Sequence, residues 1–65
     1  MTQVQKEIVR AMARNSLNIT QAANELYRSP QCLRYHRWRL MDLYGLDMRK
    51  FYDLQKLLEL ADKDQ

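Results

Sequence analysis

The chain has 65 residues, of which 46% are hydrophobic and 29% charged, with one glycine, one proline and one cysteine. This balance suits a compact helical domain and excludes disordered, collagen-like and turn-rich β proteins. A chain this short has room for one core only, so we expect a single domain over residues 1–65. The lone Cys32 excludes an intramolecular disulfide and gives no metal-ligand spacing, so we expect a reducing cytoplasm and neither a metal nor a cofactor.

The net charge of +3 is unevenly distributed. Residues 1–25 carry +1, residues 26–41 carry +4 without an acidic residue, and residues 42–65 carry −2. Such a basic block is typical of an element that binds a polyanion, with a solvated helix face as the alternative. No window approaches the roughly 20 apolar residues of a membrane span, and no signal peptide is recognisable, so no membrane partner is expected.

The first predicted helix runs from an N-cap at Thr2 to about Arg14. Its apolar residues fall on one stripe at helical spacing, which predicts that they face a core. They are Val4, Ile8, Ala11 and Met12. Residues 15–18 then form a polar break, with Leu17 expected to turn inward.

A second helix is expected to begin at Thr20, whose hydroxyl can accept a hydrogen bond from a free N–H of the first turn. Two alanines on its inner face would let a crossing helix approach closely. The inner face is predicted to hold Ala22, Ala23, Leu26 and Tyr27, and the chain then turns through Arg28.

Ser29-Pro30 predicts the start of a third helix, because serine caps well and proline is favoured at the first helical position. Gly45 is expected to end this helix, after Tyr44, in a left-handed conformation. The inner face should hold Leu33, Leu40 and Tyr44, and the outer face Gln31, Arg34, Tyr35 and Trp38. Arg37 falls near the buried side, where its stem could lie on the core with its guanidinium in solvent.

After a short connection over residues 46–48, a final helix is predicted over residues 50–61. Its inner face should hold Phe51, Leu54, Leu57, Leu58 and Ala61. The polar tail over residues 62–65 is expected to fray. The predicted fold is therefore an all-α domain of about four helices.

The order helix, turn and Ser-Pro-capped helix places Ala23 ten residues before Leu33. This spacing fits a helix-turn-helix motif with its core at residues 19–44, a small residue in the first helix and an aliphatic anchor in the second. We therefore expect a domain that binds double-stranded DNA.

A more specific pattern extends over about residues 6–61. It comprises Leu17-Asn18-Ile19-Thr20, Ala23, Leu26-Tyr27, Leu33-Arg34-Tyr35, Arg39-Leu40, Leu43, Gly45-Leu46-Asp47, Asp53-Leu54 and Leu60-Ala61. In these segments the chain resembles the C-terminal DNA-binding domain of PucR/CdaR-type regulators, bacterial activators of purine-catabolism and sugar-diacid genes. It is more distantly similar to the DNA-binding end of Fis-like proteins. The resemblance implies a bacterial or phage transcription regulator.

Some residues depart from that family. Ser29-Pro30-Gln31-Cys32 stands where the family usually has His-Arg-Asn-Thr, Trp38 replaces a basic residue and Arg37 replaces a leucine. These changes lie at or beside the expected reading face, so the target sequence should differ. Family members carry the domain at the end of a longer chain, so we expect either an excised domain or a free-standing small regulator.

The third helix would enter the major groove with its N-terminal residues near base edges. Gln31 and Arg34 are the expected base readers, since Gln pairs well with adenine and Arg with guanine. Tyr35 could contact a phosphate or a thymine methyl group. The alternatives are a solvent-facing role for Gln31 and a rim position for Tyr35.

Arginines flanking the third helix fit contacts to phosphates, with the helix N-terminus near Thr20 offered to the DNA backbone. Arg37 equally fits a structural role. The residues expected at the DNA are Thr20, Arg28, Ser29, Gln31, Cys32, Arg34, Tyr35, Arg37, Trp38 and Arg39. Because one copy offers little contact area, a homodimer or several copies along the DNA are expected.

Other functions are less well supported. A redox switch at Cys32 competes with a plain small side chain, and His36 is expected to be a partly buried helix residue rather than a metal ligand. No nucleophile–base pair or Gly-rich phosphate loop is evident, so an enzyme is not expected. The rival to DNA binding is a protein-binding module that uses Trp38 and Tyr35 as an anchor patch.

Overall fold

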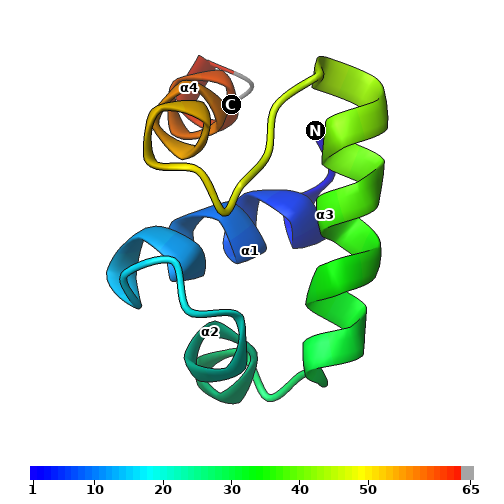
Figure 1. The fold of residues 1–65 in the computed structure, drawn as a ribbon, viewed down its shortest axis with the longest axis vertical. Coiled ribbons are helices and arrows are strands. Elements are labelled where there is room, and N and C mark those ends of the chain that lie inside the picture. Colours follow the sequence, from blue (N-terminus) through cyan, green and yellow to red (C-terminus); the bar gives the residue numbers. More distant parts are fainter. Residues whose placement is uncertain (64–65) are drawn as a thin grey trace.

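The computed structural model describes residues 1–63, which form four helices and no strand (Figure 1). The helices are α1 (Gln3–Arg14), α2 (Ile19–Glu25), α3 (Pro30–Tyr44) and α4 (Phe51–Lys63). The predicted all-α class of about four helices is confirmed. Within this part of the chain no helix is long and apolar enough to cross a membrane.

The polar tail was expected to fray over residues 62–65. Asp62 and Lys63 instead form the last residues of α4. Asp64 and Gln65 lie outside the described residues.

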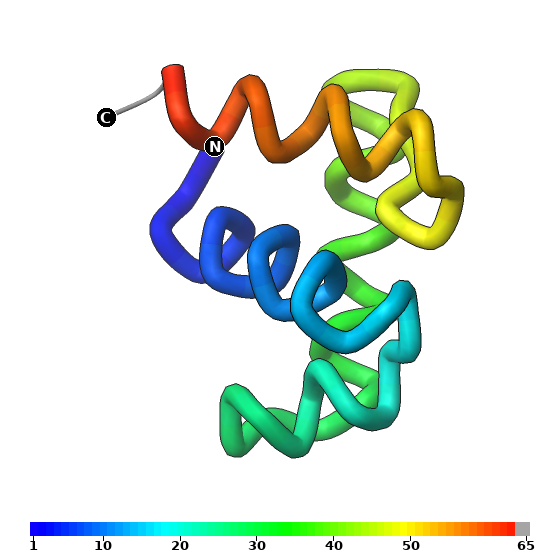
Figure 2. Tube along the Cα trace, turned by 90° about the vertical axis from the view of Figure 1, so that its left-hand side faces the viewer, coloured from blue at the N-terminus to red at the C-terminus, as the bar shows by residue number. Residues whose placement is uncertain are grey.

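Helix α1 is the centre of the fold. It packs against each of the other three helices, and α2 also packs against α3. Helices α1 and α4 run side by side in opposite directions (Figure 2). Helices α2 and α4 lie on opposite sides of α1, and the backbones of α3 and α4 do not pack against each other (Figure 1). One face of α3 therefore stays open to solvent along its whole length.

Three predicted helix ends are confirmed. The Thr2 hydroxyl accepts a hydrogen bond from the N–H of Gln5, whose side chain returns one from the Thr2 N–H, so the two residues form a capping box. Ser29 Oγ accepts from the N–H of Cys32 at 3.2 Å, with proline at the first position of α3. Gly45 ends α3 at a φ of 68°, a conformation that glycine adopts without the strain of a side chain.

The predicted cap of α2 is wrong. Asn18, not Thr20, is the N-cap, and its Oδ1 accepts a hydrogen bond from the N–H of Gln21 at 3.0 Å. Asparagine is a somewhat better cap than threonine, so the helix begins at Ile19. Thr20 lies in the first turn with its side chain exposed.

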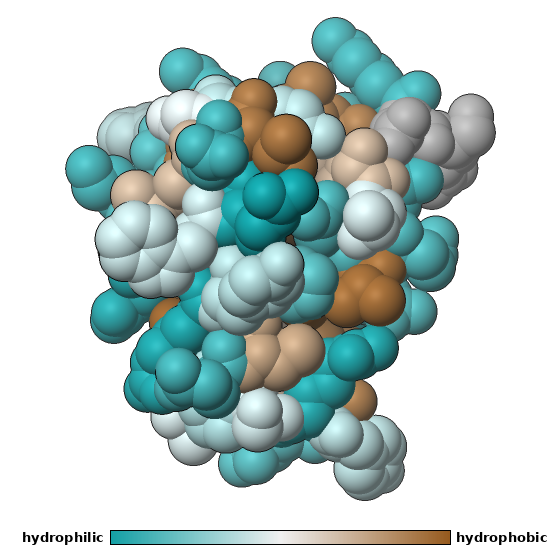
Figure 3. All heavy atoms as spheres, turned by 90° about the vertical axis from the view of Figure 1, so that its right-hand side faces the viewer, coloured by the Kyte–Doolittle hydropathy of each residue, from teal (hydrophilic) through white to brown (hydrophobic). Residues whose placement is uncertain are grey.

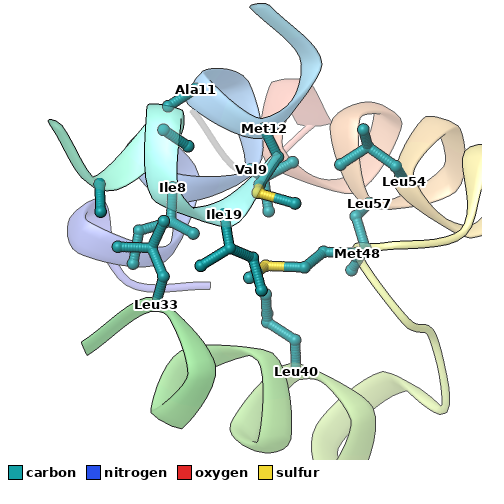
Figure 4. Close-up of a cluster of buried hydrophobic side chains, with 12 residues drawn as sticks. Ile8, Val9, Ala11, Met12, Ile19, Leu33, Leu40, Met48, Leu54 and Leu57 are labelled. Carbon is teal, nitrogen blue, oxygen red and sulfur yellow. The ribbon is translucent and has the colours of Figure 1, made fainter. Parts of the chain in front are cut away.

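One hydrophobic cluster draws on all four helices and on the segment between α3 and α4 (Figure 4). Ala22 and Ala23 are fully buried, which allows α2 to approach its neighbours closely. Met48, also fully buried, comes from the connecting segment and lies between Leu40 of α3 and Leu57 of α4. The cluster comprises Ile8, Val9, Ala11, Met12, Ile19, Ala22, Ala23, Leu33, Leu40, Met48, Leu54 and Leu57.

Three aromatic residues that were predicted to face the core are exposed. Tyr27 is 97% exposed because α2 ends at Glu25 and Tyr27 takes a left-handed φ of 56°, which turns its side chain off the helix face. Tyr44 and Phe51 are 36% and 67% exposed. They end α3 and begin α4, at the edge of the core, where Tyr44 lines an open hollow with Leu60 of α4 and Phe51 lines an open groove with Met12 of α1.

Candidate nucleic-acid interface

The outer face of α3 carries a ridge formed by Gln31, Tyr35 and Trp38. These side chains fall within about 60° of one another around the helix, opposite Leu33 and Leu40 of the core. Tyr35 is 60% exposed, Trp38 is 70% exposed, and Gln31 is exposed as well. Their predicted outward orientation is confirmed. Figure 3 looks onto this side of the molecule, where pale side chains of intermediate hydropathy lie among hydrophilic ones.

Arg34 lies on one flank of the ridge, about 70° from its centre. With Arg49 and Thr20 it lines a polar hollow of about 310 Å³ between the start of α2 and the connection after α3. Arg49 was not among the residues predicted to meet DNA. It follows α3 in a segment of net negative charge, and only the path of the connection brings it to Arg34.

Arg28 and Arg39 lie on the other flank. Arg39 is about 70° from the centre of the ridge in the opposite sense. Nη1 of Arg28 is 4.0 Å from Sγ of Cys32, in the first turn of α3. Burial, together with the charges of Arg28 and Arg39, lowers the pKa of the half-buried His36 between them. The imidazole is therefore neutral at pH 7, and it lies between two cations.

The arginines divide into two sets. Members of the first set form ion pairs: Arg10 with Asp62, Arg14 with Glu25 and Arg37 with Asp47. Members of the second set have no carboxylate partner among residues 1–63, and they are Arg28, Arg34, Arg39 and Arg49. All four lie on α3 or in the segments that join it to α2 and α4. The unpaired arginines are thus gathered around one helix, whereas the exposed Lys56 and Lys63 lie on α4.

Arg37 has a structural role. Its Nε and Nη2 donate to the two carboxylate oxygens of Asp47 at 2.8 and 2.9 Å. Its guanidinium therefore reaches a carboxylate rather than open solvent. The sequence left open a phosphate contact or a structural role for Arg37, and the structure supports the structural role. Hydrogen bonds from Arg37 are the main reason that the pKa of Asp47 falls to about 2.

Asp47 also fixes the path of the connection between α3 and α4. Its carboxylate accepts a hydrogen bond from the N–H of Arg49 at 3.0 Å, and its own N–H donates to Asp53 of α4 at 3.1 Å. Asp47 is therefore hydrogen-bonded to both Arg37 of α3 and Asp53 of α4. This network places the Arg49 side chain beside the start of α2.

The free energy of unfolding should depend on Asp47 at low pH. Its pKa is 3.8 ordinarily and about 2 in the folded protein, so its contribution is complete above pH 4 and is lost as the pH falls through about 2. The loss should amount to at most about 2 kcal/mol. Urea denaturation of the wild type and Asp47→Asn between pH 2 and 6 measures it. The variant should show a flatter pH dependence, and equal dependences would contradict this role of Asp47.

An apolar groove of about 430 Å³ lies between the end of α1 and the start of α4. It is lined by Met12, Ala13, Ser16, Leu17, Phe51, Leu54, Gln55 and Leu58. The groove shares Ser16 and Leu17 with the hollow beside α2, but none of the unpaired arginines lines it. Within residues 1–63 no group of three or more His, Cys, Asp or Glu side chains is placed to hold a metal ion.

The structure thus brings most of the predicted residues to one region. Ser29, Gln31, Cys32, Arg34, Tyr35, Trp38 and Arg39 lie on or directly before α3, with Thr20 and Arg28 beside it. Ser29 caps the helix, and Arg37 is held by Asp47. No protein-family model, curated protein or solved structure matches the chain.

Proposed function

We propose that this protein binds double-stranded DNA with α3 in the major groove. The observation that carries the proposal is the ridge of Gln31, Tyr35 and Trp38 with unpaired arginines on both flanks. The major groove is about 12 Å wide, admits an α-helix and is bordered by the phosphates of both strands. A helix in that groove needs cations on its two flanks and base-reading groups between them, and α3 offers this arrangement.

In this arrangement α2, the turn and α3 act as a helix-turn-helix, in keeping with the resemblance to PucR/CdaR-type regulators. Gln31, in the first turn of α3, and Arg34, one turn later, would meet base edges. Arg28 and Arg39 would contact phosphates on one side of the groove and Arg49 on the other. Phosphate contacts fix the position of the helix, whereas the ridge reads the sequence.

Specific binding is proposed to use two or more copies. The described residues expose 4297 Å² in total, and single DNA-binding modules bury about 600–1,000 Å² of protein surface. One copy can therefore bury only a small area against DNA, even if it uses most of the surface on one side of the molecule. In a two-fold pair the two α3 helices would lie about 34–36 Å apart. Sites selected from a random DNA pool should then show half-sites with centres about 10 base pairs apart.

Fluorescence anisotropy with random-sequence duplex DNA tests the proposal directly. The association constant should fall steeply with salt, by about 0.9 log units per tenfold rise in salt for each phosphate neutralised. With Arg28, Arg39 and Arg49 on phosphates, the slope should be about −3. Circular dichroism checks that the sample is folded. If the folded protein binds no duplex at low salt, the proposal is wrong.

A protein-binding module is the second candidate. Trp38 and Tyr35 favour it, because exposed aromatic side chains of this size often anchor protein interfaces. The anisotropy measurement separates the candidates. If the folded protein does not bind duplex DNA at low salt, protein binding through the aromatic side chains is favoured. If it binds with a steep salt dependence, DNA binding through the arginines is favoured.

A further inference from the structure

We infer that Tyr35 and Trp38 read the 5-methyl groups of thymines, so that the preferred duplexes carry thymine where they face the outer side of α3. This inference rests on the proposed DNA binding and names the base that the aromatic part of the ridge selects. It depends on the exposure, spacing and unused hydrogen-bonding groups of two side chains.

Tyr35 and Trp38 lie three residues apart, on the same side of α3 in successive turns. They are 60% and 70% exposed, and neither side chain makes a hydrogen bond within residues 1–63. Tyr35 is steadied by an edge-to-face contact with His36, whose ring centroid is 5.2 Å away. The ridge therefore presents two large rings, one of them supported by a neighbouring ring, at the level where a groove-bound helix meets the bases.

The chemistry of the groove floor then favours one base. Thymine alone presents an apolar group there, its C5-methyl, whereas guanine, adenine and cytosine present hydrogen-bonding atoms. An indole or phenol ring against those polar atoms would leave them without partners. Against a methyl group the ring buries apolar surface on both sides. Aromatic side chains on this ridge therefore select thymine over the other bases.

The residues on either side limit how much DNA the ridge reads. Gln31 precedes Tyr35 by one turn and pairs well with adenine, the partner of thymine on the other strand. Asp42 follows Trp38 by one turn, is exposed, and would repel nearby phosphates. The neutral ridge from Gln31 to Trp38 rises about 10 Å along the helix axis, which corresponds to about three base pairs. We therefore expect the ridge to contact an A/T-containing segment of about three base pairs.

Deoxyuridine provides the test, since it lacks only the methyl group of thymidine. Duplexes that bind the full chain are selected from a random pool and then resynthesised with deoxyuridine in place of thymidine. The dissociation constant should rise about fourfold for each methyl group that the rings contact. Trp38→Ala should bind the two forms more nearly alike, and Lys56→Ala, an exposed change on α4, should discriminate as the wild type does.

The outcomes separate this inference from the proposed function. Equal affinity of the wild type for both forms, or selected sites without thymine, overturns the inference and leaves DNA binding intact. If deoxyuridine lowers the affinity of the wild type and of Trp38→Ala equally, the effect comes from a change in duplex shape. This result also overturns the inference. Absence of binding to any duplex at low salt overturns both. Because Trp38 is 70% exposed, Trp38→Ala should fold, and Tyr35→Ala provides a second variant.

Discussion

Replacing Arg34 and Arg49 together with alanine should weaken binding to duplex DNA at low salt about a hundredfold, or about tenfold for each charge-assisted contact. The two side chains line one hollow beside the start of α2 and have no carboxylate partner in the described part of the chain. Loss of Arg49, the phosphate contact of the two, should also make the salt slope shallower by about 1, since one phosphate would keep its counterions. Anisotropy titrations at several salt concentrations measure both effects.

The matched control removes the same charge elsewhere. Lys56 and Lys63 are exposed on α4, and neither lines the hollow that holds Arg34 and Arg49. Replacing both with alanine should change the affinity by less than about threefold, because charges beyond about 10 Å are screened at 0.1 M salt. Neither double variant should lower the free energy of unfolding by more than about 1 kcal/mol. Equal losses of affinity would show that net charge alone drives binding.

Short-range signals account for what the sequence predicted well. The N-cap at Thr2, the Ser29-Pro30 start and the Gly45 end each depend on residues within a few positions, and all three occur as predicted. The cap of α2 was misplaced by two residues because Asn18 and Thr20 both suit that role. Element type is therefore well determined by the sequence, whereas the exact boundary depends on competition between nearby caps.

Long-range packing accounts for what was missed. Helical periodicity assigns Tyr44 and Phe51 to inner faces, but both stand at helix ends at the edge of the core and stay exposed. Conversely, Met48 lies in a connection without periodicity and is fully buried. Periodicity describes one helix at a time, and it does not tell which part of that helix finds a partner.

The candidate site shows the same division. The outward direction of Tyr35 and Trp38 follows from the period of α3 and was predicted correctly. The partner of Arg37 lies ten residues away and depends on how the chain returns after Gly45. Arg49 reaches Arg34 for the same reason. The ridge could therefore be predicted from the sequence, whereas the basic flank that includes Arg49 could be recognised only from the tertiary fold.

Replacing Met48 with alanine should lower the free energy of unfolding by about 2–4 kcal/mol, the range for removal of a large buried side chain. Proteins of this length are stable by only about 3–10 kcal/mol in total, so a considerable fraction of the variant could be unfolded at 37 °C. The reason is specific to this fold. The backbones of α3 and α4 do not pack against each other, and the Met48 side chain lies between Leu40 and Leu57 (Figure 4).

Met41 provides the matched comparison, since the same substitution there removes a side chain that is 38% exposed on α3. Met41→Ala should cost no more than about 0.5–1 kcal/mol in urea denaturation. If the two variants were equally stable, Met48 would not be the link between α3 and α4. If Met48→Ala alone is destabilised, α3 owes its position relative to the rest of the core partly to a single connecting residue. Weaker duplex binding by the folded fraction of that variant would then follow from a displaced Arg49, which the same connection carries.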